Sequence, residues 1–207
     1  GTRYLLFVTD VLNQQGETNE TNNLQALAIT LTAPDLTVTE VDGPAVVSLS
    51  QSVTVSWTVQ NAGSVSAPGG WTDYLYLSPT ASVTGQSVYI ASETISGPTI
   101  PLAANGTYTV SKTFSVPSVA LDDWFWVVVT DANHAQGETN EANNLLAAAV
   151  QVAAPDLVVT GSTSPATAII GGTAEVSWTV QNQGPVTAPA DWYDRVFLSD
   201  DDQVGGD

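Results

Sequence analysis

The chain repeats itself at a fixed interval. The segment TDVLNQQGETNETNN at 9–23 returns as TDANHAQGETNEANN at 130–144, and VSWTVQN at 55–61 returns unchanged at 176–182. Both intervals are equal, since 130 − 9 and 176 − 55 each give 121. A gapless period of this kind indicates that one folded unit is used again in tandem. The repeat constrains the fold more strongly than any single residue does.

The period divides the chain into one complete unit and two partial units. Residues 33–153 make the complete unit, residues 1–32 match the end of a unit, and residues 154–207 match the beginning of the next. We therefore expect a window on a longer array, in which neighbouring repeats of the same chain are the first partners of each unit.

The unit alternates short apolar runs with turn signals, which is typical of an all-β sandwich. Its second run, SVTVSWTVQN, places alternate residues on one face, with Trp57 in the middle. This pattern predicts an immunoglobulin-like or fibronectin-III-like β-sandwich in which Trp57 fills the core. The predicted strands are 35–41, 52–61, 71–78, 87–95, 107–116, 123–131 and 144–152.

The junctions between units are short. They read Ala33-Pro34-Asp35 and Ala154-Pro155-Asp156, without a Gly/Ser linker. Proline fixes its own φ and biases the preceding residue to extended structure. We therefore expect neighbouring units to be stiffly coupled, as in a rod.

The charge balance excludes several partners. The net charge is −18, from 21 acidic residues against three basic ones. Nucleic acids and anionic membranes need a basic surface, so neither is an expected partner, and no apolar run is long enough for membrane insertion. The chain has no cysteine, and its single histidine, His134, stands where the other copy has Asn13. A sole base present in one copy argues against catalysis, and we predict that the unit is not an enzyme.

The segment after residue 130 is crowded with side-chain oxygens and carries no Lys or Arg. Calcium prefers six to eight oxygen ligands from carboxylates, amides, carbonyls and water. We predict a Ca²⁺ site in this loop, with a plain polar hairpin as the alternative. Asp73 and Asp194 are added to the candidate Ca²⁺ ligands on the expectation that their strand lies beside the hairpin. The remaining candidate ligands are Asp131, Glu138, Asn140, Glu141 and Asn144, and in the other copy Asp10, Glu17, Asn19, Glu20 and Asn23.

Several ordered motifs together resemble the CARDB family, the cell-adhesion-related domain found in bacteria. They are the APDL start, VSWTVQNAG, WTDYLYLS, and WVVVTD followed by GETNEANN. The resemblance spans 33–153 and both partial units. It implies an Ig-like sandwich in large exported bacterial proteins, at the cell surface and associated with adhesion, and it names no ligand.

Three functions remain open. The first is a non-catalytic structural repeat of an extracellular stalk, fibre or adhesin, stiffened by calcium. The second is a module that binds a cell-surface glycan or protein through exposed aromatic residues, with candidates Trp71, Tyr74, Trp124 and Trp126. The third is a subunit of a homo-oligomeric filament, assembled through the unpaired strand edges of the partial units.

Overall fold

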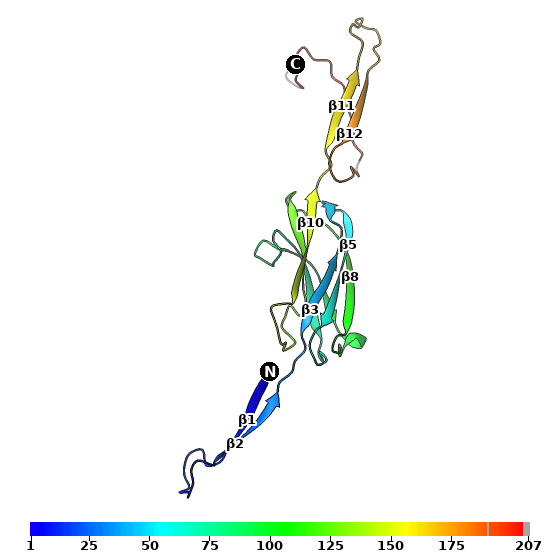
Figure 1. Cartoon of the computed structure of the whole chain (residues 1–207). Helices are drawn as coiled ribbons and strands as arrows, with labels where there is room; N and C mark the ends of the chain where they lie inside the picture. Colours follow the sequence, from blue (N-terminus) through cyan, green and yellow to red (C-terminus); the bar gives the residue numbers. More distant parts are fainter. Residues whose placement is uncertain (190, 205–207) are drawn as a thin grey trace.

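The computed structural model describes residues 1–189 and 191–204. It consists of a β-sandwich with a two-stranded hairpin on either side (Figure 1). The elements are β1 (Thr2–Val8), β2 (Leu24–Thr30), β3 (Leu36–Asp42), β4 (Val46–Ser48), β5 (Ser52–Asn61), β6 (Trp71–Ser78), β7 (Val88–Ile95), η1 (Gly97–Thr99), β8 (Thr107–Ser115), β9 (Asp123–Val129), β10 (Leu145–Ala153), β11 (Leu157–Thr163) and β12 (Ser177–Asn182).

The sandwich pairs a five-stranded sheet, in the order β4-β10-β9-β6-β7, with a three-stranded sheet, β3-β5-β8. The prediction of an all-β, Ig-like sandwich is confirmed. All seven predicted strands are present, with ends shifted by at most two residues. Strand β4, which has only three residues and pairs in parallel with β10, was not predicted from the sequence.

The core lies between the two sheets and is built by alternation. In β5 every second residue from Val53 is buried, and Trp57 is only 1% exposed, as its place among alternating valines predicts. Trp71 and Trp126 reach the same core from the other sheet.

The chain changes sheets between β3 and β4. A Cβ at Gly43 would lie 3.0 Å from Cγ2 of Val55 and 3.3 Å from the Trp126 ring, so the backbone passes directly over the core there. The Trp126 Nε1–H donates to the Pro44 carbonyl at 3.3 Å. This crossover brings the N-terminal part of the sandwich alongside the last strand, β10.

The two flanking hairpins reproduce the pairing of the sandwich. Val8 faces Leu24 in β1–β2, as Val129 faces Leu145 in β9–β10. The β11–β12 pair repeats β3–β5, including the bulge after Val159. The 121-residue period is thus a structural period as well. Among the residues that the structure describes, none lies in a helix with the length and hydropathy of a bilayer-spanning segment.

Candidate functional site

An aspartate shapes the start of the acidic loop in both copies. Asp131 has a φ of 42°, and its carboxylate accepts hydrogen bonds from the backbone N–H groups of Ala135 and Gln136, both at 2.8 Å. Asp10, with a φ of 41°, holds the N–H groups of Gln14 and Gln15 in the same way. Aspartate tolerates positive φ and readily caps nearby amides, which accounts for its place here.

Beyond that turn, the loop fastens the entry linker, defined here as residues 33–37. The Glu138 carboxylate accepts hydrogen bonds from the backbone N–H of Leu36 and from Nδ2 of Asn144. The Thr139 N–H donates to the Pro34 carbonyl at 3.0 Å. The GETNEANN motif of the unit therefore contacts the APDL motif that begins the same unit.

Two more contacts complete this side of the entry linker. Nδ2 of Asn143 donates to Oδ1 of Asp35 at 3.1 Å, and the Thr37 hydroxyl donates to the Asn143 carbonyl at 3.1 Å. On the other side, the Asp35 N–H donates to Oδ1 of Asn61 at 3.1 Å. A Cβ at Gly63 would lie 2.7 Å from the backbone of Pro34 and Asp35. The entry linker is thus held between two loops.

The first copy brings three carboxylates together. Oxygens of Asp10, Glu17 and Glu20 all lie within 4.8 Å of one another, and this is the one such group in the described part of the chain. Nδ2 of Asn23 donates to Glu17 at 2.8 Å, whereas Oδ1 of Asn19 accepts hydrogen bonds from Thr21. Five of the candidate ligands are therefore in one loop, and three of them converge.

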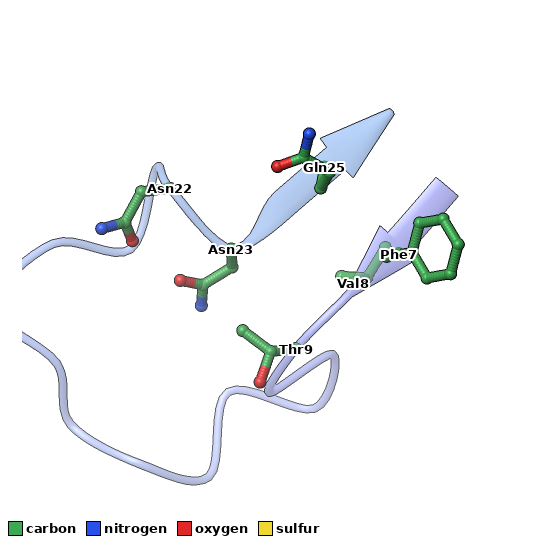
Figure 2. A pocket seen from close by; sticks show the side chains of 6 residues that line it. All are labelled: Phe7, Val8, Thr9, Asn22, Asn23 and Gln25. Atoms are coloured by element: carbon green, nitrogen blue, oxygen red, sulfur yellow. The ribbon is translucent and has the colours of Figure 1, made fainter. Parts of the chain in front are cut away.

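The end of the first hairpin forms a shallow pocket beside this cluster. The Thr9 N–H donates to the Asn23 carbonyl at 3.0 Å, which closes the hairpin where the loop begins. Figure 2 shows Asn22 and Asn23 in the loop just before β2, with the amide of Asn23 on the side of Thr9 and that of Asn22 pointing away from it. The pocket is lined by Phe7, Val8, Thr9, Asn22, Asn23 and Gln25.

The equivalent carboxylates of the complete unit are engaged differently. Glu138 accepts a hydrogen bond from the Leu36 N–H, and Glu141 pairs with His134 at 3.0 Å. The Glu138 N–H also donates to Glu141 at 3.3 Å, as the Glu17 N–H donates to Glu20 at 3.1 Å in the first copy. Burial, with the nearby charges of Asp131 and Glu141, raises the pKa of the Glu138 carboxyl. Asn140 accepts from the Ala142 N–H at 3.1 Å, as in an ordinary Asx turn.

Two buried amide oxygens of this loop, Oδ1 of Asn143 and Oδ1 of Asn144, have no hydrogen-bond partner. Asn144 is 4% exposed, and its Oδ1 accepts no hydrogen bond, although its Nδ2 donates to Glu138. Buried polar atoms normally find a partner. The loop offers carboxylate and amide oxygens as ligand atoms and no thiolate, with the His134 imidazole beside Glu141, and such oxygens suit a hard cation such as calcium.

Asp73 lies in the core and not in the acidic cluster. Its strand β6 does lie beside β9, but its carboxylate accepts hydrogen bonds from Trp57 Nε1 at 2.9 Å, Tyr108 Oη at 2.8 Å and Thr130 Oγ1 at 2.8 Å. Burial raises the pKa of Asp73, against the lowering effect of these donors. Asp194 forms the same bond with Trp178, at 2.9 Å.

The aromatic candidates separate into two groups. Trp71 and Trp126 are buried, and Trp124 packs against the core. Tyr74, by contrast, belongs to a cluster with Tyr76 and Tyr89 on the outer face of β6 and β7, with ring centroids 5.8–6.1 Å apart. Tyr74 was a candidate from the sequence, whereas its neighbours Tyr76 and Tyr89 were not, although the alternation of Tyr74 and Tyr76 in WTDYLYLS could have indicated the first of them.

The chain is similar to several solved structures. No protein of curated function matches the chain. The CARDB domain of a Pyrococcus furiosus protein, solved in complex with di-metal ions, is 21% identical over 60% of this chain and 97% of its own, with a TM-score of 0.46. A domain of a Methanosarcina acetivorans protein described as a cell surface protein is 21% identical, with a TM-score of 0.45, over 58% of this chain and 92% of its own.

A third structure is part of a much larger enzyme. A β-glucosidase from Listeria innocua matches over 58% of this chain but only 16% of its own length, at 18% identity and a TM-score of 0.36. The family assignment rests on the sequence itself, because the CARDB family model matches residues 33–148, which is more than half of the chain. The chain belongs to the CARDB family.

Proposed function

We propose that this chain is a non-catalytic structural segment of an extracellular or cell-surface protein, in which tandem CARDB units space another domain away from the cell. The observation that carries the proposal is the entry linker. Leu36, Asp35 and Pro34 are bonded to the acidic loop of their own unit. The backbone of Pro34 and Asp35 also packs closely against Gly63. A linker without freedom of its own favours a rod over loosely tethered beads.

The domain boundaries proposed from the period fit this role. Residues 1–32 and 154–207 carry hairpins with the pairing of β9–β10 and β3–β5, and the unit 33–153 lies between them (Figure 1). The matching strand pairs support the division into one complete and two partial units. Membership of an adhesion-related family supports the surface location.

Scattering of X-rays in solution by the whole chain tests the rod. The expected profile is that of an extended particle, and it should change when Pro34 and Asp35 are both replaced by Gly, because the linker then loses its stiffness and one of its bonds. The single variant Thr80→Gly, in the exposed β6–β7 turn, is the control. If the wild-type chain already shows the same spread of particle dimensions as the Gly variant, the linker is not stiff and the proposed rod is wrong.

We further propose that the acidic loops bind Ca²⁺ and that the ion stiffens the array. The converging oxygens of Asp10, Glu17 and Glu20, and the unpartnered Oδ1 of Asn144, support this. Relief of charge repulsion in a chain of net charge −18 would add to the stabilisation.

Thermal unfolding of the whole chain in EDTA and in millimolar calcium tests the ion. A ligand that binds only the folded state at about 100 times its Kd adds about 2.7 kcal/mol. The pairs Glu17→Gln with Glu20→Gln, and Glu138→Gln with Glu141→Gln, should each remove part of the shift. Equal curves in EDTA and calcium would leave a metal-free spacer and refute the calcium site.

The tyrosine cluster favours a second function, the binding of a neutral glycan. Tyr89 is 54% exposed and lies on the edge strand β7, and its rings share a face with Tyr74 and Tyr76. Aromatic rings with hydroxyl groups can stack on sugars and bond them. A glycan array probed with the wild-type chain and with Tyr89→Ala tests glycan binding. Binding that Tyr89→Ala weakens would support it, and an array without signal for the wild type would refute it. Assembly into a filament stays a prediction, which sedimentation of the whole chain checks.

A further inference from the structure

The complete unit contains one parallel strand pair among the residues described, and it joins the entering segment to the departing strand. In β4 and β10, Val46, Val47 and Ser48 face Gln151, Val152 and Ala153. The Gln151 N–H donates to the Ala45 carbonyl at 2.8 Å. The side chains of Val47 and Val152 are both buried in the core.

The direction of this pair matters when the two ends of the unit are pulled apart. The chain enters at β3 and continues into β4, while β10 runs beside β4 in the same direction and leaves toward β11 (Figure 1). Tension on the ends therefore slides β4 along β10. Sliding loads the evenly spaced bonds of a parallel pair together, whereas peeling would break them one after another.

A second attachment lies at the opposite end of β10. The entry linker is bonded to Glu138, Thr139 and Asn143, and β10 begins at Leu145, directly after them. The entering segment is thus fastened to β10 and its preceding loop at two places. The contacts at 138–143 shorten the path of force, because they join the linker to the start of β10 without passing through other strands.

We propose that β3–β4 and β10 form the load-bearing element of each unit, so that tension along the array passes from the entry linker into β10 and on to the next linker. β7 and β8 are edge strands outside this path, and β6 reaches it only through β9. The inference gives the proposed spacer its mechanical property and rests on that function for its biological use.

Stretching single molecules of the whole chain in EDTA tests the proposal. Unfolding of the unit 33–153 gives an extension of about 40 nm, from roughly 3.3–3.6 Å per residue. The informative pair is Val47→Ala in β4 and Val53→Ala in β5, because both remove the same atoms from the core. Val53 pairs with Phe114 of β8 and has no partner in β3. Urea unfolding of each variant gives the loss of chemical stability against which the force is compared.

The expected result is a lower unfolding force for V47A than for V53A at a similar loss of chemical stability. Asp35→Ala, which removes the bond to Asn143, should also lower the force, whereas Asp42→Ala, an exposed change on β3, should not. Equal forces for V47A and V53A would overturn the proposal. X-ray scattering tests the spacer separately from the unfolding force. A flexible chain whose units resist force would contradict the spacer alone, and a stiff chain with equal forces for the two variants would contradict the load-bearing element alone.

Discussion

The indole Nε1–H of Trp57 donates to the Asp73 carboxylate at 2.9 Å, and both residues are buried. The pair links the two sheets, since Trp57 is in β5 and Asp73 in β6. Trp178 and Asp194 form the same bond at the same distance in the next repeat. An aspartate that the sequence suggests as a metal ligand therefore serves as the shared acceptor at the centre of the sandwich.

Asp73→Ala should destabilise the unit severely. It leaves the Trp57 N–H and the hydroxyls of Tyr108 and Thr130 without their acceptor, and each buried unsatisfied donor costs about 1–3 kcal/mol. We expect a loss of roughly 3 kcal/mol or more in the free energy of unfolding, measured with urea. The exposed Asp42→Ala should stay within about 0.5 kcal/mol of wild type. Similar losses for the two variants would refute the role of Asp73.

Gly63→Ala should loosen the entry linker. A Cβ there would lie 2.7 Å from the backbone of Pro34 and Asp35, so one of the two segments must move. We expect a loss of about 1–3 kcal/mol by urea unfolding, as for other overpacked sites. Gly85→Ala, where a Cβ meets open space, is the control and should be nearly neutral. A neutral Gly63→Ala would show that the linker is not tightly packed.

Lys112 is the chain's single lysine and bridges two edge strands. Its Nζ lies 2.5 Å from Oε2 of Glu93, which joins β8 to β7 across the open side of the sandwich. Because the pair is partly exposed, Lys112→Val should change stability by no more than about 1 kcal/mol. A charge on an edge strand also discourages pairing with other chains. We therefore expect Lys112→Val, but not Glu93→Gln, to self-associate in size-exclusion chromatography, and a monomeric Lys112→Val would contradict this.

In EDTA, stability should fall as the pH rises above the ordinary carboxyl pKa values of 3.8 and 4.5 and through the raised values of the folded chain. Burial raises the pKa values of Asp73 and Glu138 in the folded state, so the folded chain holds these protons more tightly than the unfolded chain. Their contribution is greatest below the ordinary values of 3.8 and 4.5 and is lost as the pH passes the raised values. Urea midpoints across this range measure the slope, which Glu138→Gln should reduce. Stability that rises with pH over this range would contradict the prediction.

The strands could be predicted because alternation and turn residues are local signals. SVTVSWTVQN and WTDYLYLS are strands over their whole predicted length. The inward orientation of Asp73 could also have been predicted, because alternate residues of a strand share a face and Asp73 alternates with Trp71, Leu75 and Leu77. Strand β4 could not be predicted, because a strand of three residues is too short to show an alternating pattern.

The candidate site was harder to predict because its contacts are distant in sequence. The bond from Leu36 to Glu138 spans 102 residues and that from Asn143 to Asp35 spans 108. The repetition of both motifs shows that they matter but not that they meet. Oxygen-rich composition alone suggested a metal ligand set, and it could not distinguish a carboxylate that caps amides, such as Asp131, from one that faces its neighbours, such as Glu17.

The entry linker makes all of its described contacts with the unit that it enters, through residues 61–63 and 138–143. Neither junction depends on the identity of the unit before it. In the array that we propose, a whole unit could therefore be inserted or removed at a junction without loss of these bonds. The length of the proposed array is free to vary while the structure of each joint stays the same.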